Sequence, residues 1–185
     1  NVLREAIKSL EITGAVHSTP GVGIVIQEFN TDFFLSNLIY SISDEDQLHK
    51  EIEELRRVLE LGFAKDAFDR MTENGIALLS EKVVTMEELF NQIKRSHSSV
   101  YGVKFAETDA AFHKILFQDV DNRLLKSIIE FFWACDRYYK VKTTHSNMEL
   151  TVEKHQRICH ALKAGSYSDF YDAMQFHFNV GYFKR

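Results

Sequence analysis

The sequence predicts an all-α protein built mainly as an antiparallel bundle of six to seven helices. The 185 residues contain one proline and eight glycines, so few positions interrupt a helix. Hydrophobic residues make up 45 % of the chain, which is enough for a real core and excludes a disordered protein. From Thr31 onward, apolar residues recur at helical spacing almost without a break.

The first 30 residues are expected to form a helix and a β-hairpin. Apolar residues at helical spacing span 1–12, and Gly14 ends that helix. Two short segments rich in β-branched residues then flank a turn at Pro20 and Gly21. Such a fragment cannot bury a core, and the chain begins without a methionine or a helix cap. We therefore expect residues 1–30 to be the remnant of a larger domain whose first part is missing.

Residues 31–185 are expected to form a second, all-helical domain. The predicted helical segments are 32–43, 44–71, 73–83, 85–100, 103–120, 122–142, 147–164 and 168 to the C-terminus. Thr31 is expected to cap the first of them, and Thr85 with Glu88 predicts a capping box. Gly165 followed by Ser166 predicts a tight turn between two antiparallel helices. The apolar stripe predicted for segment 44–71 consists of Leu48, Ile52, Leu55, Leu59, Phe63 and Ala67.

Charge and cysteine usage restrict the classes of partner. The net charge of −5 gives no overall attraction to nucleic acid, so any DNA contact has to be local. No run of 18 apolar residues could form a membrane-spanning helix. Cys135 and Cys159 form no CxxC-type pattern, and both are expected to be buried thiols. These features predict a cytoplasmic protein.

Asp109 and His113 are four residues apart on a predicted helix and therefore share one face. The pair could chelate a cation or form only a local hydrogen bond. His155 and His177 lie eleven residues before and after Ser166, so at 1.5 Å per residue they stand at equal heights above the turn. They can face each other across the two helices. Three imidazoles and one carboxylate would suit Zn²⁺, Ni²⁺, Mn²⁺ or Fe²⁺. No role is expected for His49, His97, His145 or His160.

Arg56 and Glu60 are also four residues apart, on the segment 44–71. They could belong to a solvated charged face. Alternatively, Arg56 points inward as a fork for a carboxylate ligand and Glu60 holds it in place.

These residues resemble the GntR-type transcription regulators of the FadR subfamily, whose sensing domain is called FCD. Residues 2–11, with Gly14, Pro20, Gly21 and Gly23, resemble the recognition helix and wing of a winged helix-turn-helix. The sensing domain is similar to the rest of the chain through four stretches. They are Arg56-x-x-x-Glu60, Asp109-x-x-Phe112-His113 with Asn122, Glu153-x-His155-x-x-Ile158 with Ala161 and Leu162, and His177.

The resemblance implies a regulator and not an enzyme. Its metal ligands would be Asp109, His113, His155 and His177, with zinc the first choice and nickel, manganese or iron the alternatives. A small organic acid would be the effector, contacted by Arg56, Glu60, Asn122 and Arg137. A homodimer would bind operator DNA through Arg4, Lys8, His17 and Gly21, and no membrane partner is implied.

Two other functions fit the residues taken without the resemblance. A metal held by three histidines and a carboxylate, with an open position, could activate water in a hydrolase-like enzyme. The histidines could also be ordinary core residues of a metal-free helical interaction module. Turnover of small carboxylate esters or amides would identify the enzyme, whereas a lack of bound metal and of stabilisation by metal would identify the interaction module.

Overall fold

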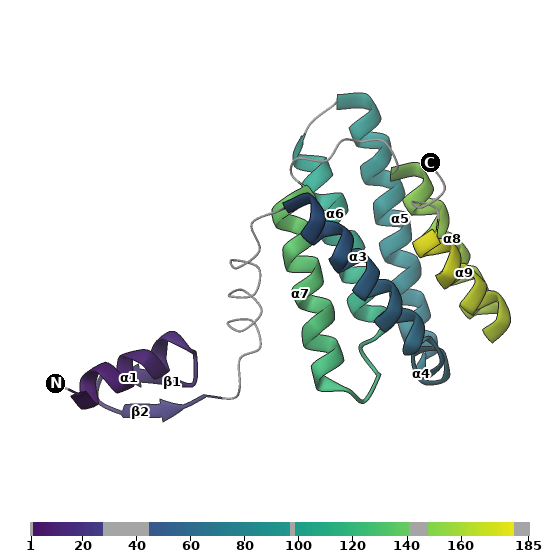
Figure 1. Cartoon of the computed structure of the whole chain (residues 1–185). Coiled ribbons are helices and arrows are strands. Elements are labelled where there is room, and N and C mark those ends of the chain that lie inside the picture. Colours follow the sequence, from purple (N-terminus) through teal and green to yellow (C-terminus); the bar gives the residue numbers. More distant parts are fainter. Residues whose placement is uncertain (1, 28–44, 97–98, 141–147, 180–185) are drawn as a thin grey trace. The chain divides into compact units, whose positions relative to one another are not determined.

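The computed structural model describes residues 2–27, 45–96, 99–140 and 148–179 (Figure 1). The chain divides into two compact units, Asn1–Leu48 and His49–Arg185. The predicted boundary at residue 30 and the helix predicted for 32–43, with its Thr31 cap, lie outside the described residues. None of the helices in the described part is both long and apolar enough to cross a membrane.

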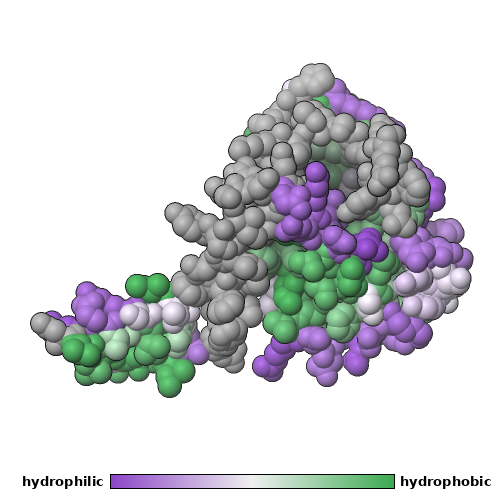
Figure 2. Space-filling model, viewed as in Figure 1, coloured by the Kyte–Doolittle hydropathy of each residue, from purple (hydrophilic) through white to green (hydrophobic). Residues whose placement is uncertain are grey.

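The N-terminal unit is a helix followed by a hairpin, as predicted. Helix α1 (Val2–Ile12) ends at Gly14, whose φ of 69° is in the left-handed region that favours glycine. Strands β1 (Val16–Thr19) and β2 (Gly23–Ile26) pair antiparallel, with Val16 opposite Ile26. Helix α1 buries no residue, and Val2 and Ile26 are more than four-fifths exposed. Figure 2 shows hydrophobic surface on this unit, and none of the residues 2–27 is buried.

The helical unit contains most of the regular structure. Its described helices are α3 (Glu45–Gly62), α4 (Ala64–Arg70), α5 (Glu73–Ser96), α6 (Ser99–Leu116), α7 (Arg123–Lys140), α8 (Met148–Ala164) and α9 (Tyr167–Asn179). The boundary between the two units falls near the beginning of α3. Helices α5, α6 and α7 lie side by side, and the α8–α9 pair packs against α5 (Figure 1).

The core of this unit lies between α5, α6, α7, α8 and α9. Its largest side chains are less than 2 % exposed, and they include Leu79, Met86, Phe112, Phe117, Ile129, Ile158, Phe170 and Met174. Burial of such apolar surface contributes about 25 cal/mol per Å² to folding. The same apolar layer surrounds three buried polar groups, Asp109, His113 and His155.

The turn between α8 and α9 has the predicted geometry. Gly165 has a φ of 65°, its N–H donates to the carbonyl of Leu162, and the N–H of Ser166 donates to that of Ala161. This pair of hydrogen bonds is the Schellman motif. The hydroxyl of Ser166 then accepts from the N–H of Asp169 at 3.3 Å and caps α9.

Two predicted helix boundaries are wrong. Segment 44–71 is not one helix, because the chain breaks at Phe63 between α3 and α4. The glycine at position 62 weakens the helix there, and the break lets Ala64 and Ala67 enter the core. Conversely, the predicted segment 73–83 and residues 85–96 of the next one form a single helix, α5, while residues 99 and 100 belong to α6. The hydroxyl of Thr85 donates to the carbonyl of Glu81 at 2.9 Å, a bond made inside a helix, so the predicted capping box does not form.

Candidate metal centre

Three helices bring three histidines to one point inside the helical unit. His113 comes from α6, His155 from α8 and His177 from α9, and one ligand atom from each lies within 4.8 Å of the others. His113 and His155 are fully buried, and His177 is partly buried. The equal heights predicted above the turn are thus matched by the structure: the rings of His155 and His177 are 4.8 Å apart between centroids.

Asp109 adds a carboxylate to this cluster. Its Oδ1 lies 3.0 Å from Nε2 of His155 and 3.8 Å from Nε2 of His113. Because Asp109 precedes His113 by one helical turn, both side chains leave α6 on the same face. All four residues predicted as ligands therefore meet.

Hydrogen bonds fix the protonation of two of the imidazoles. Nδ1 of His155 lies 2.6 Å from the carbonyl oxygen of Thr151, which can only accept, so this nitrogen carries the proton. Nδ1 of His113 lies 2.7 Å from Oε2 of Glu60 and donates to that carboxylate. In the neutral form, each ring then carries its lone pair on Nε2, and the two Nε2 atoms are 3.3 Å apart.

The cluster therefore has the chemistry of a cation site. With both rings neutral, two nitrogen lone pairs and Oδ1 of Asp109 converge, and a positive charge, either a metal ion or a proton on one of the rings, stabilises such a group of acceptors. Nδ1 of His177 is buried and has no hydrogen-bond partner among the described residues. Buried polar atoms are nearly always paired, so this orphaned nitrogen also fits a metal ligand set.

The electrostatic environment keeps the imidazoles in the form that binds metals. Burial lowers the pKa of His113, and the neighbouring Glu60 offsets this only in part. Burial, followed by the nearby His113 and His155, holds the pKa of His177 well below its usual range. Both rings are neutral near pH 7, as ligation requires.

Arg56 and Glu60 lie behind His113. Both side chains are buried, with Arg56 6 % and Glu60 0 % exposed, so they do not form a solvated face. Nε of Arg56 donates to Oε1 of Glu60 at 3.2 Å. Burial by itself would raise the pKa of Glu60, but His113 and Arg56 lower it overall, so the carboxylate is ionised. The predicted apolar stripe is wrong at Leu55, which is 53 % exposed, because Arg56 and Glu60 occupy the inner face with Ile52.

Trp133 was not predicted as a site residue from the sequence. It packs beside Arg56 and His113. The guanidinium carbon of Arg56 lies 4.0 Å from the centroid of its ring, and the ring of His113 lies 5.1 Å away. Nη2 of Arg56 is buried without a hydrogen-bond partner among the described residues. A buried cation stacked on an aromatic face with an unused donor is suited to an anion. The only available signal was that Trp133 is the single tryptophan of the chain.

The other predicted residues lie apart from this cluster. Oδ1 of Asn122 accepts from the N–H of Leu125 at 2.9 Å and so caps α7. The backbone of Arg137 belongs to α7, but its side chain lies outside the described residues. His160 is exposed on α8, while the side chains of His49, His97 and His145 are outside the described part. Cys159 is buried, which raises its pKa to about 11, and the Cys135 side chain is not among those described.

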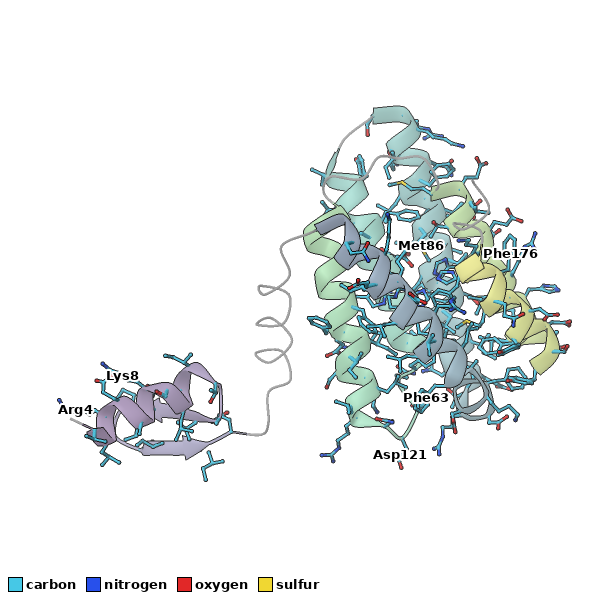
Figure 3. All side chains as sticks on the ribbon, in the orientation of Figure 1. Arg4, Lys8, Phe63, Met86, Asp121 and Phe176 are labelled. Carbon is cyan, nitrogen blue, oxygen red and sulfur yellow. The ribbon has the colours of Figure 1, made fainter. Side chains whose placement is uncertain are left out.

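The residues predicted to contact DNA belong to the N-terminal unit. Arg4 and Lys8 are exposed on α1, where Figure 3 shows both side chains projecting from the helix. His17 is exposed on β1, and Gly21 lies in the hairpin turn with a φ of 79°. Arg4 and Lys8 are one helical turn apart and therefore lie on the same side of α1.

The chain is similar to known proteins in sequence and in structure. The family model of the FCD domain matches residues 51–180. The HTH-type transcriptional regulator LutR of Bacillus subtilis (strain 168) is 24 % identical over 184 residues, which cover 96 % of this chain and 80 % of LutR. The structure of Streptococcus agalactiae GntR superposes with a TM-score of 0.71 at 22 % identity, over 95 % of this chain and 78 % of that one. E. coli McbR/YncC superposes with a TM-score of 0.57 at 16 % identity, over 97 % and 76 % of the two chains.

Proposed function

The chain belongs to the FCD domain family, and from this membership we propose that it is a transcriptional regulator that responds to a metal-bound small carboxylate. The regulator LutR, similar over almost the whole chain, supports this class of function, and the family is one of regulators and not of enzymes. The observation that carries the proposal is the convergence of four side chains: one nitrogen from each of His113, His155 and His177 lies within 4.8 Å of the others, and Oδ1 of Asp109 lies 3.0 Å from Nε2 of His155.

These four residues would hold one divalent cation. Imidazole nitrogen and carboxylate oxygen suit Zn²⁺ first, and Ni²⁺, Mn²⁺ or Fe²⁺ as alternatives. When bound, the metal supplies a Lewis-acidic anchor for an effector oxygen. Thr151 and Glu60 orient the rings of His155 and His113 from behind, which is how outer hydrogen bonds normally support metal ligands.

The metal proposal is tested by elemental analysis after loading with zinc and desalting. The chain should retain one equivalent of zinc, and the variant H155A/H177A should retain none. H160A is the matched control, since His160 lies on the same helix as His155 but is exposed. Retention of zinc by the double variant would eliminate the proposed ligand set. A wild-type chain without zinc would favour the interpretation of the histidines as ordinary core residues.

The effector would be a small organic acid that meets Arg56. Nε of Arg56 is occupied by Glu60, so an incoming carboxylate has the Nη2 edge of the guanidinium available. The stacking of Arg56 on Trp133 holds this edge in place. Contact of the effector with Asn122 and Arg137 is part of the same proposal. Calorimetric titration with acetate, lactate and malonate tests it: R56A should lose binding, and equal affinity in R56A and wild type would remove Arg56 from the site.

The N-terminal unit would contact operator DNA. Arg4 and Lys8 of α1 would lie in a major groove, and His17 and Gly21 of the hairpin would approach the adjacent backbone or minor groove. The protein would act in the cytoplasm as a homodimer. The dimer would fix the distance between the two half-sites of the operator DNA. The effector would act by binding more tightly to one dimer arrangement than to the other. Gel-shift titration of R4A/K8A against wild type tests the DNA contact, and unchanged affinity would contradict it.

A further inference from the structure

We propose that Glu60 is a positioning residue that holds the metal site and the anion site in their working geometry at the same time. This inference rests on the proposed function, because it concerns the two binding sites named there. Glu60 was predicted to contact the effector, but its two oxygens bond to Arg56 and His113, so we place it behind both sites and not among their ligands. It lies on α3, which carries Arg56, and it contacts α6, which carries His113 and Asp109.

The two carboxylate oxygens of Glu60 are divided between the two sites. Oε1 accepts from Nε of Arg56 at 3.2 Å, and Oε2 accepts from Nδ1 of His113 at 2.7 Å. Glu60 has no exposed surface, so water cannot replace either bond without a rearrangement of the core. The side chain is therefore a single rigid link from the guanidinium to the imidazole.

Only a carboxylate can serve as this link. Both of its partners are donors, the N–H of the guanidinium and the N–H of the imidazole. A glutamine of the same shape offers one acceptor and one donor. Either its NH₂ group faces Nε of Arg56, which places two donors together, or it faces His113. In the second case His113 must move its proton to Nε2, the atom that faces the metal site. The E60Q protein therefore divides between these two amide orientations, so each of the two sites loses its geometry in part of the population.

The hydrogen bond to Glu60 also sets the strength of His113 as a ligand. An anionic acceptor on Nδ1 raises the electron density at Nε2, and loss of such an outer partner typically lowers metal affinity about 10- to 100-fold. At the anion site, Arg56 stacks on Trp133 and donates through Nε to Glu60. Its Nη2 atom then has no hydrogen-bond partner among the described residues. Without the carboxylate, the guanidinium is released from this orientation.

The experiment measures both sites in one variant. Zinc affinity is determined by chelator competition for wild type, E60Q and E54Q, where Glu54 is an exposed carboxylate on the same helix. Affinity for whichever of acetate, lactate and malonate binds wild type is then measured by calorimetry at zinc concentrations that saturate each protein. E60Q should bind zinc about 10- to 100-fold more weakly and should also lose affinity for the carboxylate after saturation with zinc. E54Q should match wild type in both assays.

The outcomes separate the inference from the proposed function. Wild-type affinities in E60Q, or a loss confined to one site, would overturn the link while the proposed function stands. A wild-type chain that binds no zinc would overturn both. Thermal unfolding of E60Q shows whether the variant is folded.

Histidine NMR keeps the inference testable on the wild-type chain even if E60Q does not fold. Long-range ¹H–¹⁵N spectra of the metal-free protein should show His113 protonated at Nδ1. In a folded E60Q, part of this population should move to the Nε2–H form, a change that a merely structural role of Glu60 would not produce. His113 protonated at Nε2 in the wild-type chain would overturn the proposal.

Discussion

The Nε2 atoms of His113 and His155 lie 3.3 Å apart, and each ring is held by a hydrogen bond from its opposite nitrogen. The acceptors behind them, a carboxylate and a backbone carbonyl, place a proton on each Nδ1, so in the neutral rings the lone pairs lie on the two facing atoms. The apolar core thus contains a preformed pair of ligands whose orientation is determined by the fold before any metal binds.

Zinc should stabilise the folded chain. A metal that binds only the folded state adds about 2.7 kcal/mol to the free energy of unfolding when its concentration is 100 times the Kd. Differential scanning fluorimetry should show a rise in Tm on addition of zinc and its reversal by a chelator. H155A/H177A should show no shift, whereas H160A should behave as wild type. A shift of equal size in the double variant would mean that zinc binds elsewhere.

Trp133 should report on metal binding. It is the only tryptophan in the chain, and its ring lies 5.1 Å from that of His113 between centroids. Coordination at Nε2 of His113 changes the charge beside the indole, so its fluorescence should change and saturate at one equivalent of zinc. Emission that is insensitive to zinc, in a chain shown by elemental analysis to hold it, would contradict the placement of His113 in the ligand set.

The metal-free chain should lose stability in mildly acidic solution. An unfolded histidine has a pKa near 6.5, and burial lowers the pKa of His113 and of His177 in the folded state. Below pH 6.5 the unfolded state therefore binds protons that the folded state excludes. Each histidine should cost about 1.4 kcal/mol per pH unit until its folded pKa is reached. Urea unfolding from pH 8 to 5 measures the slope, which should be shallower in H177F than in H160A. Identical slopes in these two variants would contradict the assignment.

Removal of the Thr85 hydroxyl should not destabilise the protein. An N-cap threonine replaced by alanine costs about 1 kcal/mol, but Thr85 lies inside α5 and bonds to Glu81. Alanine has the higher helix propensity there, so T85A should be neutral or stabilising by about 0.5 kcal/mol. N122A is the contrasting variant, because Asn122 caps α7 and its loss should cost about 1 kcal/mol. Denaturant unfolding compares them, and a larger loss in T85A than in N122A would contradict these assignments.

Local patterns predicted the features that depend on neighbouring residues. Helical periodicity located most helices of the bundle, and the glycine at position 165 predicted the turn that aligns His155 with His177. The pairing of Asp109 with His113 also follows from their spacing in α6. Two helix boundaries were wrong. The break at Phe63, next to the glycine that ends α3, was missed, and the capping pattern of Thr85 lies inside α5, where its hydroxyl bonds to the Glu81 carbonyl.

The contacts of Arg56, Glu60 and Trp133 behind the predicted ligands could not be predicted from local sequence patterns. Glu60 and His113 are 53 positions apart in the chain, and only the packing of α3 against α6 brings them into contact. The sequence around Arg56 is rich in charged residues, so its pattern is compatible with a solvated face as well as with a buried one. Trp133 precedes the predicted effector residue Arg137 by one helical turn, but an aromatic residue in such an apolar segment is equally typical of a core position.

The Schellman turn at Gly165 determines the relative heights of His155 and His177 in the candidate metal centre. Each residue added to a helix rotates the downstream part of that helix by about 100° and lifts it by about 1.5 Å. One residue inserted into α9 before His177 would move the His177 ring away from the cluster, even though the chain would still contain all four predicted ligands. The spacing of eleven residues on each side of Ser166 is therefore as much a part of the site as the imidazoles themselves. Single-residue insertions and deletions should disable the centre more thoroughly than most substitutions around it.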